Sequence, residues 1–361
     1  MARTLGGRNE EGRMRRRLLV ASVSALLLLS GSVLYGTGTI DLWQAERSLE
    51  QTCGGLPPLA EVQQLLGEKG IRGRPLEPEE YPGLTPLVSC RLAWSGKLPG
   101  VELRISKGEI NPAVLRDMRH DSLGLPDATS APFGEGWRGV VTNDLGDFAS
   151  ATVLLNCGAG ARDIWVHGWA YAFGSPGFEE KEYRVQLSRV VGSTAASAAE
   201  KWDCEPPPSS LPGDAVPTPN GADPVEVVDA SGTCAGMAHL ADLAEEFGIK
   251  KVLETDADSV APVEDCFLLN SDGEKIYRFT SLYDGLASTY RIVDGIAESS
   301  GVADRGVPRW LSSTCPSGVD GFHWLTAVEP EYGNGEMKFQ QAALEELAAK
   351  SAERKDCAIG E

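Results

Sequence analysis

The stretch Cys53-Gly54-Gly55-Leu56 returns later in the chain as Cys234-Ala235-Gly236-Met237. Apolar residues at helical spacing follow both copies, over 59–66 in the first and 240–247 in the second. Each run ends at a glycine that can take the positive φ common at helix C-termini. The same order, a cysteine followed by a glycine, an apolar residue and a predicted helix, occurs twice. This recurrence indicates an internal duplication.

The eight cysteines divide into two sets of four with matching surroundings. The second cysteine of each set, Cys90 or Cys266, lies in an apolar run typical of a strand, and the fourth, Cys204 or Cys357, ends a predicted helix. The complete sets are Cys53, Cys90, Cys157 and Cys204, then Cys234, Cys266, Cys315 and Cys357. We therefore expect two tandem units with separate cores, at 53–204 and 233–361, joined by a semi-rigid proline-rich linker at 205–232.

Each unit is predicted to contain a helix, a hairpin, a long connection, a second hairpin and a last helix. The strands are expected at 91–94, 101–105, 151–156 and 164–171 in the first unit, and at 266–269, 275–280, 309–313 and 321–328 in the second. The last helices are expected at 183–202 and 337–355. Antiparallel strands grouped between helices are typical of an α+β fold.

The N-terminal region has the pattern of a membrane anchor. Six arginines and two glutamates lie in residues 1–17, and no charged residue occurs from Leu18 to Ile40. About 20 apolar residues in a helix span a bilayer core, and the basic flank favours a cytoplasmic N-terminus. The prediction is a cytoplasmic tail at 1–17, a single transmembrane helix at 18–40 and a juxtamembrane stalk at 41–52. A cleaved signal peptide is the alternative, although Gly36-Thr37-Gly38 matches a cleavage site poorly.

All eight cysteines follow the predicted anchor, and an oxidising compartment would join them in disulfides. Four cysteines allow three connectivities in each unit. We favour first-to-second and third-to-fourth, because each bridge then ties a helix to a neighbouring hairpin. A zinc site is the weaker interpretation, since the chain has no closely spaced cysteine pair.

The net charge of −19 argues against nucleic acid as a partner, because an acidic body repels the phosphate backbone. The simplest interpretation of the negative charge is that it keeps the protein soluble. The acidic clusters at 254–258 and 329–331 lack the ligand spacing of a calcium loop, so we expect them to be solvated loops. No metal or cofactor is predicted.

Two histidines lie beside tryptophans in what the pattern makes equivalent strands. They form a possible ligand patch of His167, Trp169, His323 and Trp324. A histidine there could also respond to pH near neutrality. The competing interpretation is an ordinary strand residue packed near aromatic rings, and we prefer it.

The signatures of a serine-nucleophile elbow, a zinc protease helix, a phosphate loop and a dinucleotide loop do not occur in the sequence. Bridged cysteines would also leave no thiol nucleophile. The sequence therefore predicts no catalytic residue, and we expect a protein that is not an enzyme.

The bias toward alanine, glycine, arginine and glutamate, with a short arginine-rich tail before a single anchor, resembles actinobacterial, streptomycete-type cell-envelope proteins. The predicted anchor makes this a single-pass protein with the bulk of the chain expected outside the cytoplasm. The expected function is a binding or structural module of the cell envelope, with a protein or ligand of unknown identity as partner. The alternatives are an extracytoplasmic enzyme with an unfamiliar site, or a sensor that acts through another protein.

Overall fold

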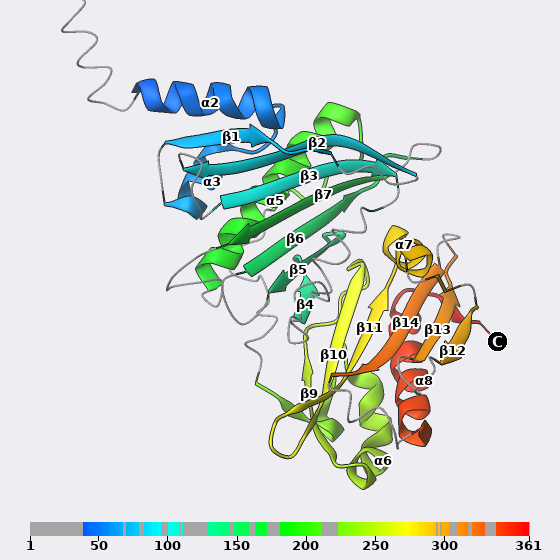
Figure 1. Cartoon of the computed structure of the whole chain (residues 1–361). Coiled ribbons are helices and arrows are strands. Elements are labelled where there is room, and N and C mark those ends of the chain that lie inside the picture. The colour runs from blue at the N-terminus through cyan, green and yellow to red at the C-terminus, as the bar shows by residue number, and fades with distance from the viewer. Residues whose placement is uncertain are drawn as a thin grey trace, which may run out of the picture.

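The computed structural model describes residues 39–360 apart from short segments. These are 68–69, 79–82, 95–99, 109, 111–128, 144–147, 159–162, 172–180, 211–222, 294, 297, 303–308, 317–319 and 329–336. The described chain forms two units, each an antiparallel sheet with a long helix on one face (Figure 1). The predicted α+β class with two antiparallel sheets and flanking helices is confirmed.

The first unit begins with two helices and ends with a long one. The helices are α2 (Thr39–Cys53), α3 (Leu59–Leu66) and α5 (Lys181–Trp202). The strands are β1 (Ile71–Pro75), β2 (Leu84–Trp94), β3 (Gly100–Gly108), β4 (Thr129–Pro132), β5 (Gly139–Asn143), β6 (Phe148–Leu155) and β7 (Ile164–Tyr171).

The second unit repeats this order with shorter opening helices. Its helical segments are η2 (Val227–Asp229), η3 (Ala235–Leu240), α6 (Ala241–Glu246), α7 (Gly285–Val293) and α8 (Met337–Arg354). Its strands are β8 (Val225–Glu226), β9 (Ile249–Glu254), β10 (Val263–Asn270), β11 (Lys275–Leu282), β12 (Ser300–Val302), β13 (Arg309–Thr314), β14 (Asp320–Ala327) and β15 (Ala358–Ile359).

The two sheets follow the same path. The first has the order β1-β2-β3-β7-β6-β5-β4, and the second runs β12-β13-β14-β11-β10-β9-β8. Read from β9, the second sheet becomes β9-β10-β11-β14-β13-β12, which matches the first sheet strand for strand from β1 to β5. This shared topology supports the predicted repeat.

Each unit has its own apolar core between the sheet and its long helix. In the first, α5 buries Val190, Val191 and Ala195 against β6 and β7. In the second, α8 buries Phe339 and Leu344 in the same way. Removing such apolar surface from water is the main stabilising contribution in a domain of this size.

Four disulfides, two in each unit, join neighbouring elements, and the described chain has no free cysteine. The connectivity is the one favoured from the sequence. The bridges are Cys53–Cys90, Cys157–Cys204, Cys234–Cys266 and Cys315–Cys357. Every bridge links a helical segment or its end to a strand or strand end, as expected from the positions of the cysteines.

The end of the long helix is built alike in both units. Asp203 and Asp356 take left-handed φ values of 55° and 56°, directly before the fourth cysteine. The amides of Cys204 and Cys357 each donate a hydrogen bond of 2.9 Å to a helix carbonyl five residues back. Asp tolerates this conformation better than most non-glycine residues, so the same helix stop appears twice.

Residues 41–52, expected as a stalk, belong to the first unit instead. They form most of α2, which lies along the β1 edge of the sheet and buries Ala45 and Leu49 (Figure 1). Their spacing of four residues places both on one helical face. The linker is also partly structured, because β8 and η2 fall within 205–232 and β8 pairs with β9.

The two units also share a third apolar cluster, so their cores are not fully separate. The first unit contributes Ile110, Val140, Leu154 and Trp165. The second contributes Val263, Leu282, Leu286, Ala287, Tyr290, Phe322 and Trp324. An ion pair of 2.9 Å between Arg138 and Asp284 lies at the same junction. The expected semi-rigid spacer therefore joins units that are in direct contact.

The predicted tail at 1–17 lies outside the described residues, as does nearly all of the predicted anchor at 18–40. Among the helices that the structure describes, none combines the length and apolarity needed to cross a bilayer.

Candidate functional site

The two histidines of the predicted patch lie on opposite faces of their sheets. Strand pairing traced from the second cysteine of each unit makes Gly168 equivalent to Leu325. His167 is one residue before Gly168, whereas His323 is two residues before Leu325. A shift of one residue along a strand reverses the face to which a side chain points. The expectation that these histidines occupy equivalent places is therefore wrong.

His323 faces α8 and is fully buried. Its Nδ1 lies 2.7 Å from the Ser281 hydroxyl and its Nε2 lies 2.9 Å from the Ser313 hydroxyl. The ring also stacks on Phe279, with ring centroids 6.4 Å apart. Burial lowers the pKa of His323 to about 3. His323 is therefore a neutral core residue, as the preferred interpretation expected.

His167 and Trp169 lie together on the face of the first sheet that points away from α5. We call this the open face. His167 is buried, with its Nδ1 2.8 Å from the Thr152 hydroxyl. Trp169 packs on Phe148 and Tyr171, with ring centroids 5.8 and 4.9 Å away. Trp324 takes part in the cluster between the units. The four residues of the predicted patch are thus divided among three environments.

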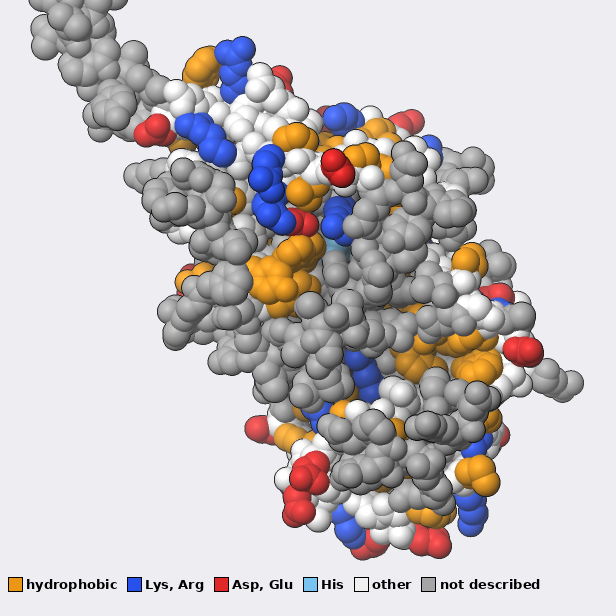
Figure 2. All heavy atoms as spheres, viewed as in Figure 1, with side chains coloured by type: hydrophobic (Ala, Val, Ile, Leu, Met, Phe, Trp, Pro, Cys, Tyr) orange, Lys and Arg blue, Asp and Glu red, His pale blue; other side chains and the backbone are white. Residues whose placement is uncertain are grey.

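Charged residues follow the open face toward the β1 edge. Arg74 is directly opposite Arg91, Arg91 is opposite Glu102, and Glu102 is opposite Trp169. The Glu102 carboxylate accepts a 2.7 Å hydrogen bond from Arg91 Nε and lies 3.7 Å from Arg104 Nη2. Figure 2 shows Lys and Arg side chains gathered over this part of the upper unit, with hydrophobic side chains beside them.

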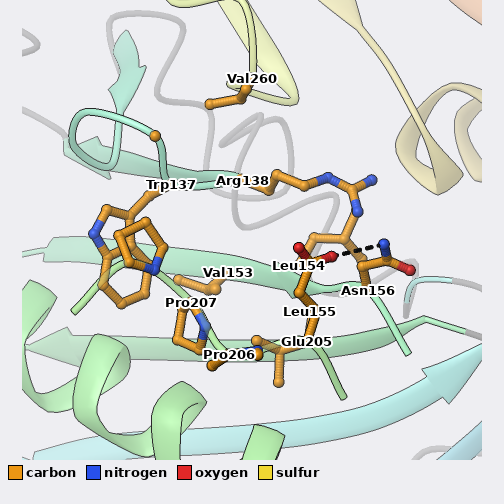
Figure 3. Close-up of a pocket in the computed structure, with 12 residues that line it drawn as sticks. Trp137, Arg138, Val153, Leu154, Leu155, Asn156, Glu205, Pro206, Pro207 and Val260 are labelled. Carbon is orange, nitrogen blue, oxygen red and sulfur yellow. Dashed lines mark hydrogen bonds between the residues drawn. The ribbon is translucent and has the colours of Figure 1, made fainter. Parts of the chain in front are cut away.

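A groove of about 380 Å³ lies where the two units and the linker meet. Trp137 and the prolines that follow Cys204 line one end, and Arg138 extends along the other (Figure 3). Asn156 donates a 3.0 Å hydrogen bond to Glu205 at its floor, and Val260 of the second unit closes the far side.

A second hollow of about 210 Å³ continues this groove through Arg138 and Val260. Lys355 lines it and donates hydrogen bonds to the carbonyls of Asp258 and Ser259, at 3.0 and 2.8 Å. Its ammonium group also lies 5.1 Å from the ring centre of Tyr283. Burial lowers the pKa of Lys355 to about 8 and raises the pKa of Tyr283. Lys355 therefore holds the loop that carries Val260.

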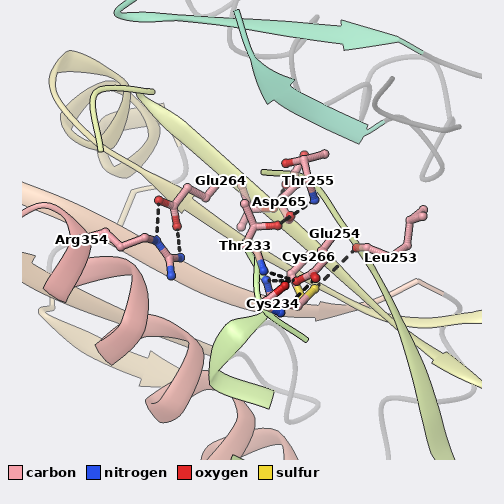
Figure 4. The surroundings of a disulfide bond; sticks show 12 residues. Thr233, Cys234, Leu253, Glu254, Thr255, Glu264, Asp265, Cys266 and Arg354 are labelled. Carbon is pink, nitrogen blue, oxygen red and sulfur yellow. Dashed lines mark hydrogen bonds and ion pairs between the residues drawn. A yellow bond between two sulfur atoms is a disulfide. The ribbon is translucent and has the colours of Figure 1, made fainter. Parts of the chain in front are cut away.

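Asp265 connects the sheets at the floor of the junction. Its buried carboxylate accepts hydrogen bonds of 3.2 and 2.7 Å from Arg278 and one of 2.6 Å from Thr280. It also accepts a 2.8 Å bond from the amide of Ser130 in β4. Figure 4 shows Asp265 directly before Cys266, with the ion pair of Glu264 and Arg354 nearby. The carboxylate is fully satisfied, which indicates a structural role.

The acidic cluster at 254–258 is not simply a solvated loop. Glu254 accepts hydrogen bonds from the amides of Ser231, Gly232 and Cys234, at 3.0, 2.8 and 3.1 Å (Figure 4). The carboxylate thus fixes the turn that carries the first cysteine of the second unit. The cluster at 329–331 lies outside the described residues. Within the part of the chain that the structure describes, no group of side chains has a metal-binding arrangement.

Comparison with known proteins gives no relative for this chain. No family model and no curated protein matches it. Among solved structures, the di-domain ARO/CYC StfQ from the steffimycin biosynthetic pathway aligns over 82% of this chain and 94% of its own. The identity is 12% and the TM-score is 0.14, so this likeness supports no statement about fold or function.

Sequence reasoning missed both the groove and the charged row. The groove joins residues far apart in the sequence, such as Trp137 and Val260, and no local pattern marks that contact. The charged row had a weak signal, because Arg72 and Arg74 are two residues apart, the period that places side chains on one face of a strand, and so are Glu102 and Arg104. That signal becomes readable only when the strands are known to be neighbours.

Proposed function

We propose that this protein is a membrane-anchored, extracytoplasmic binding module of the cell envelope, whose binding site is the groove between its two units. The observation that carries the proposal is the groove itself, which both units and the linker line. A concave site at a domain junction is a common place for a ligand or a partner segment to bind.

The rigidity of the junction supports this function. The shared apolar cluster, the pair of Arg138 with Asp284 and the contact between Ser130 and Asp265 hold the two walls in one arrangement. A preformed site loses little conformational entropy on binding. Four disulfides agree with the proposed location, because such bridges persist in oxidising compartments.

The test is site-specific photo-crosslinking in intact cells. A photoreactive amino acid replaces Val260, a partly exposed groove residue, in the full-length chain. The matched control places it at Val228, an exposed valine in η2. We expect a discrete crosslinked product from position 260 that is missing from position 228. Equal labelling at both positions, or none at either, would refute the groove as the binding site.

The location has its own test. A reporter enzyme that is active only outside the cytoplasm, fused after Glu361, should be active, and a reporter that is active only in the cytoplasm should not. The opposite pattern would contradict the proposed topology.

A further inference from the structure

The open face of the first sheet carries charges that its fold does not require. Strand pairing makes Arg91, Glu102 and Trp169 equivalent to Phe267, Arg278 and Thr326 of the second unit. The same architecture therefore forms with an unrelated set of side chains at these positions. A structural need common to both units does not explain the charged row.

The row also places like charges next to each other. Arg74 and Arg91 are directly opposite on neighbouring strands, where like charges repel. This face of β1 to β3 carries four arginines, which are Arg72, Arg74, Arg91 and Arg104. Among the described residues of these three strands, Glu102 is the single acidic residue on the same face. The excess is positive, on a chain with a net charge of −19.

Two uncharged polar groups lie on the open face beyond Glu102, on β7 and β6. Ser150 is directly opposite Trp169, and both point to the open face. Within the described structure, Ser150 Oγ and Trp169 Nε1 are buried and have no hydrogen-bond partner. A buried polar atom without a partner is costly, and a ligand group that bonds to it removes that cost.

We propose that the open face binds an acidic sugar, a pyranose ring that bears a carboxylate or a phosphate. The guanidinium groups of Arg74, Arg91 and Arg104 bind the anionic group, since the planar fork of arginine matches both oxyanions. Trp169 and Tyr171 are partly exposed and offer ring surface to the carbon face of the sugar. Trp169 Nε1 and the hydroxyl of Ser150, which have no hydrogen-bond partner in the described structure, are placed to bond with sugar hydroxyls.

The site is distinct from the groove between the units. None of its residues lines the groove, so either site can exist without the other. Failure of this proposal leaves the proposed function of the groove untouched, and the two experiments can be interpreted separately.

Isothermal titration calorimetry of the full-length chain in detergent micelles tests the proposal. Glucuronic acid and glucose 6-phosphate are the acidic sugars, and glucose and inorganic phosphate are the controls. We expect at least one acidic sugar to bind at least tenfold more tightly than either control, with an affinity that falls as salt increases. Inorganic phosphate binding as tightly as the acidic sugars would indicate a plain anion site, and no binding of either acidic sugar would also overturn the proposal.

Single substitutions test whether these residues bind the acidic sugar. Arg74→Gln, at an exposed position where folding should not be affected, and Arg104→Gln should each weaken binding of the acidic sugar at least fivefold. Arg291→Gln removes an arginine of the second unit and should leave binding unchanged. Glu102→Gln removes the competing carboxylate and should tighten binding severalfold, which a purely structural role for Glu102 would not produce. An unchanged affinity in Arg74→Gln and Arg104→Gln would place the ligand elsewhere.

Discussion

His323 shows how one buried side chain makes stability depend on pH. Its ring is enclosed between two serine hydroxyls, which bond equally well to a neutral imidazole. Burial lowers its pKa from an ordinary 6.5 to about 3, because the charged ring would lose its hydration. His323 therefore binds a proton near pH 6.5 in the unfolded chain, but only near pH 3 in the folded chain.

This difference predicts acid sensitivity. The unfolded state binds more protons between these two pKa values, so stability is lost as the pH falls from 6.5 toward 3. We expect the free energy of unfolding to fall by about 1.4 kcal/mol for each pH unit well below 6.5. Denaturant titrations at pH 7, 6 and 5 measure this loss above the range where most carboxylates titrate. His323→Gln should flatten the dependence, and His239→Gln, at an exposed position, should not. Identical pH profiles for all three proteins would disprove the assignment.

At the scale of elements, the long helix α5 can approach the sheet closely because Gly168 has no side chain. A Cβ atom added at Gly168 would lie 2.5 Å from Val191 Cγ2 of α5 and 3.0 Å from Leu103 Cδ2. In the second unit a different contact depends on Gly236 of η3, where a Cβ would lie 2.6 Å from the carbonyl oxygen of Glu346 in α8. Both glycines allow a helix to pack closely.

Gly168→Ala should therefore destabilise the first unit by about 1–3 kcal/mol through overpacking. The double variant Gly168→Ala with Val191→Ala removes the nearest clashing atom. It should recover part of the loss beyond what Val191→Ala alone predicts. Chemical denaturation of the four proteins of this cycle measures the coupling, and strictly additive effects would show that the contact is not the cause.

The elements also show what local pattern can predict. Both predicted hairpins and the last helix of each unit are present, since their apolar period and turn residues are local signals. The edge strand β1 was missed because Ile71-Arg72-Gly73-Arg74-Pro75 contains two residues that disfavour strands. Its strand conformation is set by pairing with β2 and by packing of α2 on Gly73, neither of which is local.

At the scale of the whole molecule, the junction determines whether two units behave as one body. Trp165 is buried within the shared cluster, and its ring lies against Gly285 at the start of α7. Its indole also donates a 3.1 Å hydrogen bond to the carbonyl of Gly108. This side chain fills the contact between the units without belonging to either main core.

Trp165→Ala should therefore weaken the coupling between the units more than either core. Truncation of a buried tryptophan costs about 3–5 kcal/mol, and here much of that loss falls on the junction. Calorimetry of the parent chain should show one thermal transition, and the variant should show two. Trp43→Ala, at a half-exposed position on α2, is the matched control and should leave one transition. Two transitions already present in the parent would contradict the coupling.

The sequence by itself left three cysteine connectivities open in each unit and only favoured one of them, but it determined the duplication and the class of fold. Each of these follows from the order and spacing of residues, which recur along the chain and need no knowledge of distant contacts. Only the tertiary structure decided which face each strand presents and how the units meet. Side chains alternate faces at every residue, so a register difference of one position separated His167 from His323. The arginine row depends on the pairing of strands that are distant in the sequence, and the groove depends on the contact between the two units. Both sets of residues come together only in the folded chain.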